Sequence, residues 1–394
     1  MREAMTDVMP NAAAESQATF VLRADRQATP IDHHPLLAIW ELTQACDLAC
    51  VHCRASAVAD RDPLELSTAE GKRLLDSIRA MGTPLMILTG GDPAKRDDLV
   101  ELVRHGASIG LIMAVTPSGT GLMTKALLAE LAAAGMARVA VSIDGPDAAT
   151  HDAFRRVDGS FDHCLRILED ARALGIERQV NTTLGPHNFR AIAPMAELVG
   201  RSGAVLWSVF SVVPMGRADE GLMLTADELE HALGELADVA LSATFDVKTT
   251  AAPHFRRILL ERKAKGHPLG VLSDVDEDGT VKGPRGVNDG VGMMFISHHG
   301  EVFPSGFLPV SVGNVRRGSL AMMYRDSTLF RALREVGPTR GKCAVCPFVR
   351  VCGGSRARAY IMDGGVDGSD PACAYVPKGY PGLPSTRGDT NTGK

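Results

Sequence analysis

The sequence lacks an excess of basic residues. Its 42 Lys and Arg residues are outnumbered by 47 Asp and Glu residues, so the formal net charge is −5. A chain with this charge is poorly suited to neutralise a phosphate backbone, and no Lys-rich stripe interleaved with aromatic residues is present. We therefore expect no nucleic-acid partner.

Long apolar runs and a signal peptide are also missing. No run reaches the roughly 18 apolar residues that cross a bilayer, and residues 1–17 contain no apolar core. We therefore expect a cytoplasmic protein without a membrane partner. Residues 1–33 are polar and lack periodicity, and residues 378–394 are rich in Gly, Pro, Ser and Thr, so both ends are predicted to be disordered.

Short apolar runs alternate with helical patterns over residues 34–225. Repeated βα units of this kind predict a parallel sheet with helices on the outside. Six units are fewer than the eight that close a full barrel, so we expect an α/β fold with a partial (β/α)6 barrel. The predicted strands are 36–42, 85–89, 111–116, 138–143, 178–184 and 204–213.

The pattern changes after the sixth unit. Residues 226–290 predict a helical linker followed by a loop rich in Gly and Asp. Residues 293–306 predict a β-hairpin that turns at His299 and Gly300, and short helices follow. We therefore expect residues 291–377 to form a small C-terminal α+β domain.

Seven of the eight cysteines fall into two groups, which in a reducing cytosol favours metal ligation over disulfides. Cys46, Cys50 and Cys53 form a C-x3-C-x2-C loop after the first predicted strand, at the sheet edge where α/β proteins bind ligands. Three thiolates hold three irons of a cubane and leave the fourth iron open. The alternative is zinc, which requires a fourth ligand, and His52 is awkwardly placed beside Cys53 for that role. Cys164 stands alone in a helical pattern and is predicted to be a core residue.

The cysteine loop resembles the signature of the radical S-adenosylmethionine (SAM) superfamily. The resemblance implies a [4Fe-4S] cluster whose open iron binds SAM and whose electron cleaves it to a 5′-deoxyadenosyl radical. It also implies an oxidoreductase-type enzyme that abstracts hydrogen from a substrate, with flavodoxin or ferredoxin as electron donor. The residue before the last cysteine, usually aromatic and beside the adenine in relatives, is His52, whose imidazole can still stack.

A Gly-Gly-Asp-Pro stretch after the second predicted strand also matches the family. It supplies Gly90, Gly91 and Asp92 as expected cofactor-binding residues. Glycines let the backbone approach a ligand and offer its carbonyls to an ammonium group. On its own the stretch is equally consistent with a turn and a helix cap at Asp92.

Four further residues lie where relatives contact the cofactor. Ser142 belongs to a Ser-x-Asp-Gly motif and could bond the cofactor through its hydroxyl. Arg155 and Asn181 are expected near the methionine carboxylate and the adenosine, with a surface charge or a strand-end cap as the alternative. Thr116 ends the third strand, where Pro117-Ser118-Gly119 replaces the run that relatives usually have.

A second group of four cysteines follows the predicted hairpin, and four thiolates would complete a coordination shell. Alone, the group could equally hold structural zinc. It resembles the SPASM or shortened twitch domain of radical SAM enzymes, which implies an auxiliary iron–sulfur domain. Because Ser305 and Ser355 stand where relatives can have cysteine, we expect one auxiliary [4Fe-4S] cluster. The expected ligands are Cys343, Cys346, Cys352 and Cys373.

The segment CGGSRARAY resembles the branch of the superfamily that modifies tetrapyrroles in heme d1 and alternative heme biosynthesis. This resemblance implies an oxidative modification of a tetrapyrrole, such as decarboxylation or dehydrogenation. Arg356 and Arg358 could pair with its carboxylates, or could grip the cysteine loop instead. The alternatives are a maturase of a ribosomally made peptide, and an oxidase or epimerase of a small metabolite. Many such maturases carry a leader-recognition module, whereas fewer than fifty residues precede Cys46.

Overall fold

The structure is a computed structural model that describes residues 31–264 and 286–381. Of the ends predicted to be disordered, 1–33 and 378–394, residues 1–30 and 382–394 lie outside the described residues, whereas residues 31–33 form a turn. Most of the predicted Gly/Asp-rich loop from residue 267 to residue 290 also lies outside them. Within the described ranges, no helix has both the length and the apolar character to span a membrane.

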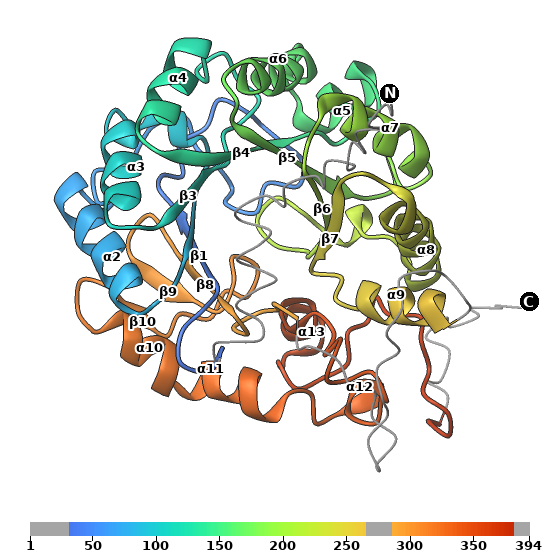
Figure 1. Ribbon diagram of the computed structural model, residues 1–394. Helices are drawn as coiled ribbons and strands as arrows, with labels where there is room; N and C mark the ends of the chain where they lie inside the picture. The colour runs from blue at the N-terminus through green and yellow to red at the C-terminus, as the bar shows by residue number, and fades with distance from the viewer. Residues whose placement is uncertain (1–30, 265–285, 382–394) are drawn as a thin grey trace, which may run out of the picture.

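A curved parallel sheet surrounded by helices forms most of the molecule (Figure 1). Its strands pair in chain order, and helices cover its outer side. The strands are β1 (Leu37–Glu41), β2 (Leu85–Thr89), β3 (Ile112–Val115), β4 (Met136–Ser142), β5 (Glu177–Leu184), β6 (Leu206–Ser211) and β7 (Asp246–Thr250). The helices are α2 (Thr68–Ala80), α3 (Leu99–Ser108), α4 (Lys125–Ala133), α5 (Ala148–Arg155), α6 (Ser160–Ala173), α7 (Ile192–Ser202), α8 (Ala226–Ser242) and α9 (Phe255–Ala264).

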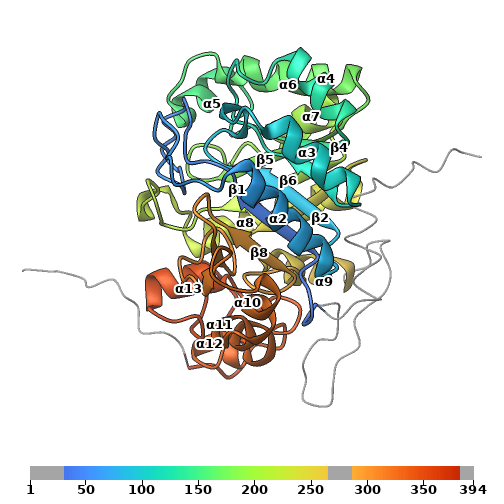
Figure 2. The same ribbon diagram turned by 90° about the vertical axis from the view of Figure 1, so that its left-hand side faces the viewer.

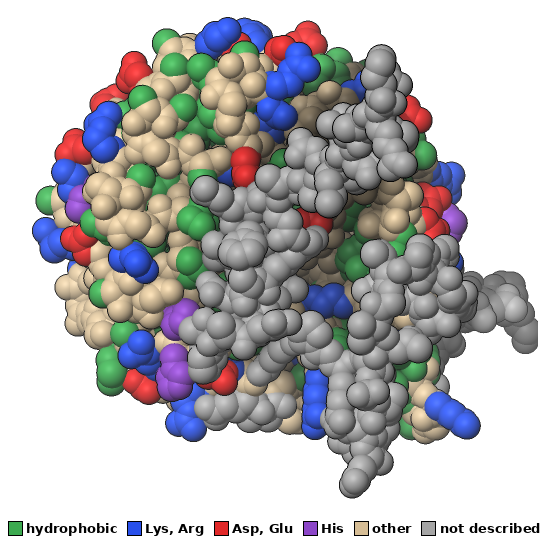
Figure 3. Space-filling view, viewed as in Figure 1, with side chains coloured by type: hydrophobic (Ala, Val, Ile, Leu, Met, Phe, Trp, Pro, Cys, Tyr) green, Lys and Arg blue, Asp and Glu red, His purple; other side chains and the backbone are tan. Residues whose placement is uncertain are grey.

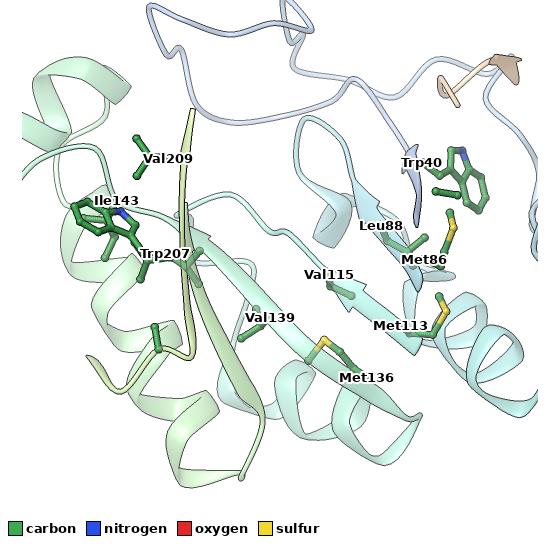
Figure 4. Close-up of a cluster of buried hydrophobic side chains, with 14 of the residues drawn as sticks. Trp40, Met86, Leu88, Met113, Val115, Met136, Val139, Ile143, Trp207 and Val209 are labelled. Atoms are coloured by element: carbon green, nitrogen blue, oxygen red, sulfur yellow. The ribbon is translucent and has the colours of Figure 1, made fainter. Parts of the chain in front are cut away.

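Alternation along the strands separates the core from a central cavity. In β1, Ala38 and Trp40 face the helices and are fully buried in the main hydrophobic core. Leu37 and Ile39, whose side chains point the opposite way, line the central cavity. Figure 4 shows Trp40 in this outer core, together with Met86 and Met113 of the two following strands. The sheet therefore has apolar residues on both faces, as expected of a parallel sheet covered by helices.

The predicted partial barrel is confirmed, but it is larger than six strands. Strand β7 pairs in parallel with β6, from Leu206 opposite Asp246 to Phe210 opposite Thr250. The sequence of β7, Asp-Val-Lys-Thr-Thr, has one apolar residue and all five residues are half-buried. A strand of this kind produces no apolar run, which is why the sequence pattern did not predict it.

The predicted β-hairpin is present and continues the barrel sheet. Strands β8 (Met293–Ile296) and β9 (Glu301–Phe303) pair antiparallel, and Gly300 occupies the turn with a positive φ of 85°. Strand β8 also pairs in parallel with β1, and β10 (Gly313–Asn314) extends the far edge, giving a ten-stranded sheet that runs from β10 to β7. The C-terminal part is therefore joined to the barrel by a shared sheet.

The C-terminal helices gather at one end of the molecule, between the hairpin and helix α9 (Figures 1 and 2). They are α10 (Leu320–Asp326), α11 (Thr328–Arg331), α12 (Gly341–Ala344) and α13 (Arg356–Asp363). On the face seen in Figure 3, the described basic and acidic side chains alternate around the rim, with no large patch of one sign.

Candidate functional site

Cys46, Cys50 and Cys53 lie in the loop after β1, and all three line the central cavity. Each sulfur has a hydrogen-bond donor. Leu48 N donates to the Cys46 sulfur at 3.4 Å, Ala57 N donates to the Cys53 sulfur at 3.4 Å, and Arg155 Nη1 lies 3.8 Å from the Cys50 sulfur. Donors of this kind stabilise thiolates and tune iron–sulfur clusters.

Burial raises the pKa of the Cys46 and Cys50 thiols, so without a bound metal these two groups stay protonated. Metal ions bind cysteine as thiolate, and iron would therefore displace these protons. Among residues 31–264 and 286–381, no group of three or more His, Cys, Asp or Glu side chains could hold a metal ion in the present side-chain arrangement. A cubane attaches each thiolate to a different iron, so its ligands need not meet at one point.

The Gly-Gly-Asp-Pro stretch after β2 fixes the cysteine loop. Gly91 N donates to Thr43 O at 2.8 Å, and Asp92 N donates to Ala45 O at 2.7 Å. A Cβ atom at position 91 would lie 2.3 Å from Ala45 O, and one at position 90 would lie 2.6 Å from Thr43 O. Both glycines line the cavity. Their lack of side chains thus permits a close approach to the cysteine loop as well as to a ligand.

Asp92 does not line the cavity and is fully buried behind it. Its carboxylate accepts hydrogen bonds from Ala94 N at 3.0 Å and from Thr120 Oγ1 at 2.8 Å. Burial, the largest influence, raises the pKa of this carboxyl group. The Asp92 carboxylate therefore joins the turn after β2 to the loop after β3.

The remaining predicted cofactor residues converge on one cavity of about 920 Å³. They come from the cysteine loop, from the carboxyl ends of strands β2 to β4, from the middle of β5 and from the end of helix α5. The predicted residues that line it are His52, Gly90, Gly91, Thr116, Ser142, Arg155 and Asn181. Adjacent parallel strands end at the same edge of a sheet, which is why residues far apart in sequence meet here.

Arg155 is held by an ion pair with Asp144, a fully buried carboxylate at the end of β4. Arg155 Nε donates to Asp144 Oδ2 at 2.6 Å, and the other carboxylate oxygen accepts from Thr183 N at 2.6 Å. Burial, the largest single influence, would raise the pKa of Asp144, but Arg155, two neighbouring histidines and the Thr183 N–H together lower it to about 2. Asp144 therefore stays ionised and positions Arg155 beside Cys50.

His52 is part of a stack of three rings. Its imidazole lies parallel to Phe154, with ring centroids 4.3 Å apart, and the other face of Phe154 stacks on His187 at 3.8 Å. Burial, followed by the charge of Arg155, lowers the pKa of His52 to about 3. The ring is therefore neutral at pH 7.

Several cavity residues were not predicted from the sequence. Ser118 follows β3, donates from Oγ to Gly91 O at 2.6 Å, and lies 3.3 Å from the Cys46 sulfur. Ser118 belongs to a Pro-Ser-Gly run that departs from the family pattern, so the sequence did not indicate this role. Four further cationic side chains line the cavity, and of these only Arg54 and Arg217, which lie in loops, could have been suspected from the sequence. The four side chains are Arg54, Arg217, Lys248 and Arg256.

The four C-terminal cysteines lie behind the cavity wall rather than on it. Val351 reaches the cavity, and Cys352 follows it directly. Gly354 N donates to the Cys352 sulfur at 3.4 Å. Burial raises the pKa of the Cys352 thiol strongly, and raises that of Cys373 to about 11. The lone Cys164 is buried in the hydrophobic core, as predicted.

Arg356 and Arg358 have structural partners and do not line the cavity. Arg358 is fully buried, and its Nη1 donates to Asp370 Oδ1 at 2.9 Å. Its other nitrogens donate to backbone carbonyls beyond β6 and β7, including Val212 O at 3.0 Å. Arg356 donates to Gly368 O at 2.6 Å. Of the two roles left open for these arginines, their contacts fit the structural one, because Arg358 ties the cysteine segment to the ends of β6 and β7 and Arg356 bonds within that segment.

The two serines at possible cysteine positions are also occupied by hydrogen bonds. Ser305 Oγ donates to Asp289 Oδ1 at 2.5 Å, and Asp289 Oδ2 accepts from Ala357 N at 2.9 Å. Ser355 caps helix α13 through a hydrogen bond from Arg358 N. Both serines therefore have evident structural roles in this part of the chain.

Residues 40–199 match the Radical SAM superfamily. The chain is 41% identical over 345 residues to the AdoMet-dependent heme synthase of Nitratidesulfovibrio vulgaris, covering 87% of this chain and 93% of the relative. It is 28% identical to the Fe-coproporphyrin III synthase of Methanosarcina barkeri, covering 88% and 89% of the two chains. It is 30% identical to the PqqA peptide cyclase of Rhodopseudomonas palustris, covering 87% and 88%.

Among solved structures, Streptococcus suis SuiB bound to S-adenosylmethionine is similar to this chain, with a TM-score of 0.69 and 16% sequence identity. The match covers 87% of this chain and 78% of SuiB. At this level of identity the likeness concerns the fold, and it agrees with the parallel sheet and its C-terminal extension.

Proposed function

The chain belongs to the radical SAM superfamily, and from that premise we propose that it carries out an oxidative modification of a tetrapyrrole, such as decarboxylation of its propionate side chains. It is an enzyme that uses S-adenosylmethionine and a [4Fe-4S] cluster. When bound, these cofactors supply a 5′-deoxyadenosyl radical that abstracts hydrogen from the substrate. The similarity to an AdoMet-dependent heme synthase supports the choice of substrate class.

We assign the cluster to Cys46, Cys50 and Cys53, the only cysteines among the described lining residues of the cavity. The hydrogen-bond donors at all three sulfurs suit thiolate ligands. Around them, Ser142, Asn181 and the backbone at Gly90 and Gly91 offer polar groups for the methionine and ribose parts of SAM. Arg155 provides a fixed positive charge for the methionine carboxylate. Asp92 supports this site from behind.

The observation that carries the substrate proposal is the composition of the cavity. Its volume of about 920 Å³ lies near the upper end for small-molecule sites. Apolar side chains cover much of its wall, as a flat macrocycle requires. Its described lining has five Arg or Lys side chains and one acid, Asp289, which suits a substrate with several carboxylates. Apolar members of the wall are Leu37, Ile39, Ile87, Ala114, Phe210 and Phe295.

Oxidative decarboxylation of a propionate balances as follows. One hydrogen atom passes from the side chain to the deoxyadenosyl group, and the resulting carbon radical loses carbon dioxide and one electron to become a vinyl group. The electron requires an acceptor. We propose that Cys343, Cys346, Cys352 and Cys373, behind Val351 in the cavity wall, would hold one auxiliary [4Fe-4S] cluster, which would supply a one-electron acceptor. A flavodoxin or ferredoxin would supply the electron that initiates SAM cleavage.

A ribosomally made peptide is the second candidate substrate, because the chain is 30% identical to a PqqA peptide cyclase. The proposal is tested by anaerobic incubation of the reduced, reconstituted enzyme with SAM and iron coproporphyrin III. We expect mass spectrometry to detect loss of carbon dioxide and two hydrogens for each converted propionate. An unchanged porphyrin, together with modification of a short peptide encoded beside the gene, would instead identify the enzyme as a peptide maturase.

A further inference from the structure

Arg217 lines the cavity, and one edge of its guanidinium group has no hydrogen-bond partner among the described residues. It lies in the segment after β6 and lines the cavity beside Cys53 and Arg54. Its Nε and Nη2 atoms are buried, and neither has a hydrogen-bond partner in the structure. These two nitrogens lie on the same side of the planar guanidinium group, where their N–H bonds point in parallel. They can therefore donate to both oxygens of one carboxylate.

The backbone around Arg217 is fixed against the cysteine loop. Arg217 N donates to Cys53 O at 3.0 Å. Gly216 has a positive φ of 64°, and a Cβ atom there would lie 2.4 Å from Cys53 O and 2.3 Å from Arg54 O. The nearby acid Asp219 turns away, since its side chain accepts from Gly221 N at 2.9 Å. The guanidinium group is therefore placed beside the cysteine loop, and it has no ion-pair partner among residues 31–264 and 286–381.

The other arginines around the cavity differ in having partners for their charged groups. Arg54 forms an ion pair with Glu41 and lies over the ring of Phe295, 4.6 Å from its centroid. Arg155 pairs with Asp144. Arg256 Nη1 donates to Val351 O at 3.2 Å. Burying donor groups without partners destabilises a protein, so a ligand that satisfies these donors binds more tightly.

We propose that the Nε and Nη2 edge of Arg217 binds a carboxylate of the substrate and so fixes the side chain that reacts. The inference rests on the proposed tetrapyrrole substrate. A carboxylate satisfies both unpaired donors at once, and a propionate at the edge of a flat macrocycle could reach Arg217 while the ring lies on the apolar wall. The cofactor carboxylate has a separate cation in Arg155, which contacts Cys50 at the other end of the cysteine loop.

The test compares the affinity of wild-type holoenzyme, Arg217→Gln and Arg217→Lys for two probes, iron coproporphyrin III and its tetramethyl ester. We expect Arg217→Gln to bind the acid about tenfold to a hundredfold more weakly than wild type, as loss of a charged hydrogen-bonded pair predicts. The ester should bind wild type and Arg217→Gln equally. Arg217→Lys, which keeps the charge but not the paired donors, should lie between the two.

Arg201→Gln is the matched control, because it removes the same charge from an exposed position on helix α7, 70% accessible at its side chain. It should bind both probes as wild type does, and all variants should retain their iron. Equal binding of the acid by wild type and Arg217→Gln would overturn the inference and leave the tetrapyrrole proposal standing. Weaker binding of SAM alone would assign the edge to the cofactor and also overturn it. Failure of wild type to bind either porphyrin would refute the proposed substrate instead.

Discussion

The Nη1 atom of Arg155 lies 3.8 Å from the sulfur of Cys50. Arg155 is held there by Asp144, so an ion pair at the end of β4 positions a positive charge beside the cysteine loop after β1. A guanidinium group at this place stabilises negative charge on the Cys50 sulfur and remains available to an anionic ligand in the cavity. This relationship connects the cysteine loop to the strand ends that are proposed to bind the cofactor.

Iron content tests the two groups of cysteines separately. The reconstituted protein should hold about eight irons, corresponding to two cubanes. Replacement of Cys46, Cys50 and Cys53 together by alanine should leave about four, because the C-terminal ligands are unaffected. Cys164→Ala is the matched control and should keep about eight, since Cys164 is buried in the core. Full iron retention in the triple variant, or zinc at the C-terminal site, would contradict the assignment.

Ser142→Ala should weaken SAM binding roughly two- to tenfold, the usual effect of losing one hydrogen bond. Its side chain lies at the cavity edge of β4, whereas Ser202 bonds its own helix through Val199 O and is absent from the cavity lining. Ser202→Ala should therefore bind SAM normally. Isothermal titration of SAM into each anaerobic, iron-loaded variant measures the difference. Identical affinities of the two variants for SAM would show that Ser142 is a strand-end residue without a part in SAM binding.

Stability should fall as the pH is lowered from 7.5 to 5.5. His254 is fully buried, and neither ring nitrogen has a hydrogen-bond partner among the described residues, although Asp370 Oδ2 lies 4.0 Å from its Nδ1. Burial lowers the pKa of His254 to about 4 and likewise lowers the pKa of His151 to about 4. In the unfolded chain both would bind protons near pH 6.5, so the unfolded state takes up more protons as the pH falls. Each histidine should reduce the free energy of unfolding by about 1 kcal/mol over this interval.

His254→Phe removes one of these groups and should therefore show a smaller pH dependence than wild type in urea unfolding. Its stability at pH 7.5 can differ for reasons of packing, so the comparison is between the two slopes. Parallel pH profiles for wild type and the variant would show that His254 is charged in the folded protein or does not titrate differently on unfolding.

Cys373→Ser tests the proposed electron acceptor. Removal of this ligand should prevent assembly of the auxiliary cluster, while the cysteine loop after β1 remains intact. The variant should still produce 5′-deoxyadenosine from SAM but no oxidised porphyrin, because the substrate radical then has no acceptor. A folded variant that lacks the auxiliary cluster and still forms product at the native rate would restrict these cysteines to a structural role.

The sequence predicted the features that depend on local pattern. The six apolar strands and the hairpin at Gly300 were identified because their periodicity and turn residues are local signals. Strand β7 was missed because Lys248 and its Thr neighbours form a half-buried edge without an apolar run. Thr116 and Asn181 were expected at the cofactor site from the family resemblance, and the sheet topology places both on the cavity.

Long-range contacts explain the site features that could not be predicted. Asp92 resembled a cofactor ligand in its motif, but only the folded chain places Thr120 against its carboxylate. Arg358 lies near the cysteines in sequence, yet its partner Val212 is 146 residues away. Arg217 belongs to no motif that was considered, and its significance comes from the absence of a partner at its buried edge in the described structure.

Transfer of isotope from substrate to cofactor tests the central claim most directly. Reduced holoenzyme is incubated with SAM and iron coproporphyrin III deuterated on its propionate side chains, and both products are analysed by mass spectrometry. The proposed function predicts deuterium in 5′-deoxyadenosine, in proportion to porphyrin that has lost carbon dioxide. Cleavage of SAM that yields only unlabelled 5′-deoxyadenosine, with the porphyrin unchanged, would contradict the claim that this enzyme oxidises tetrapyrrole side chains.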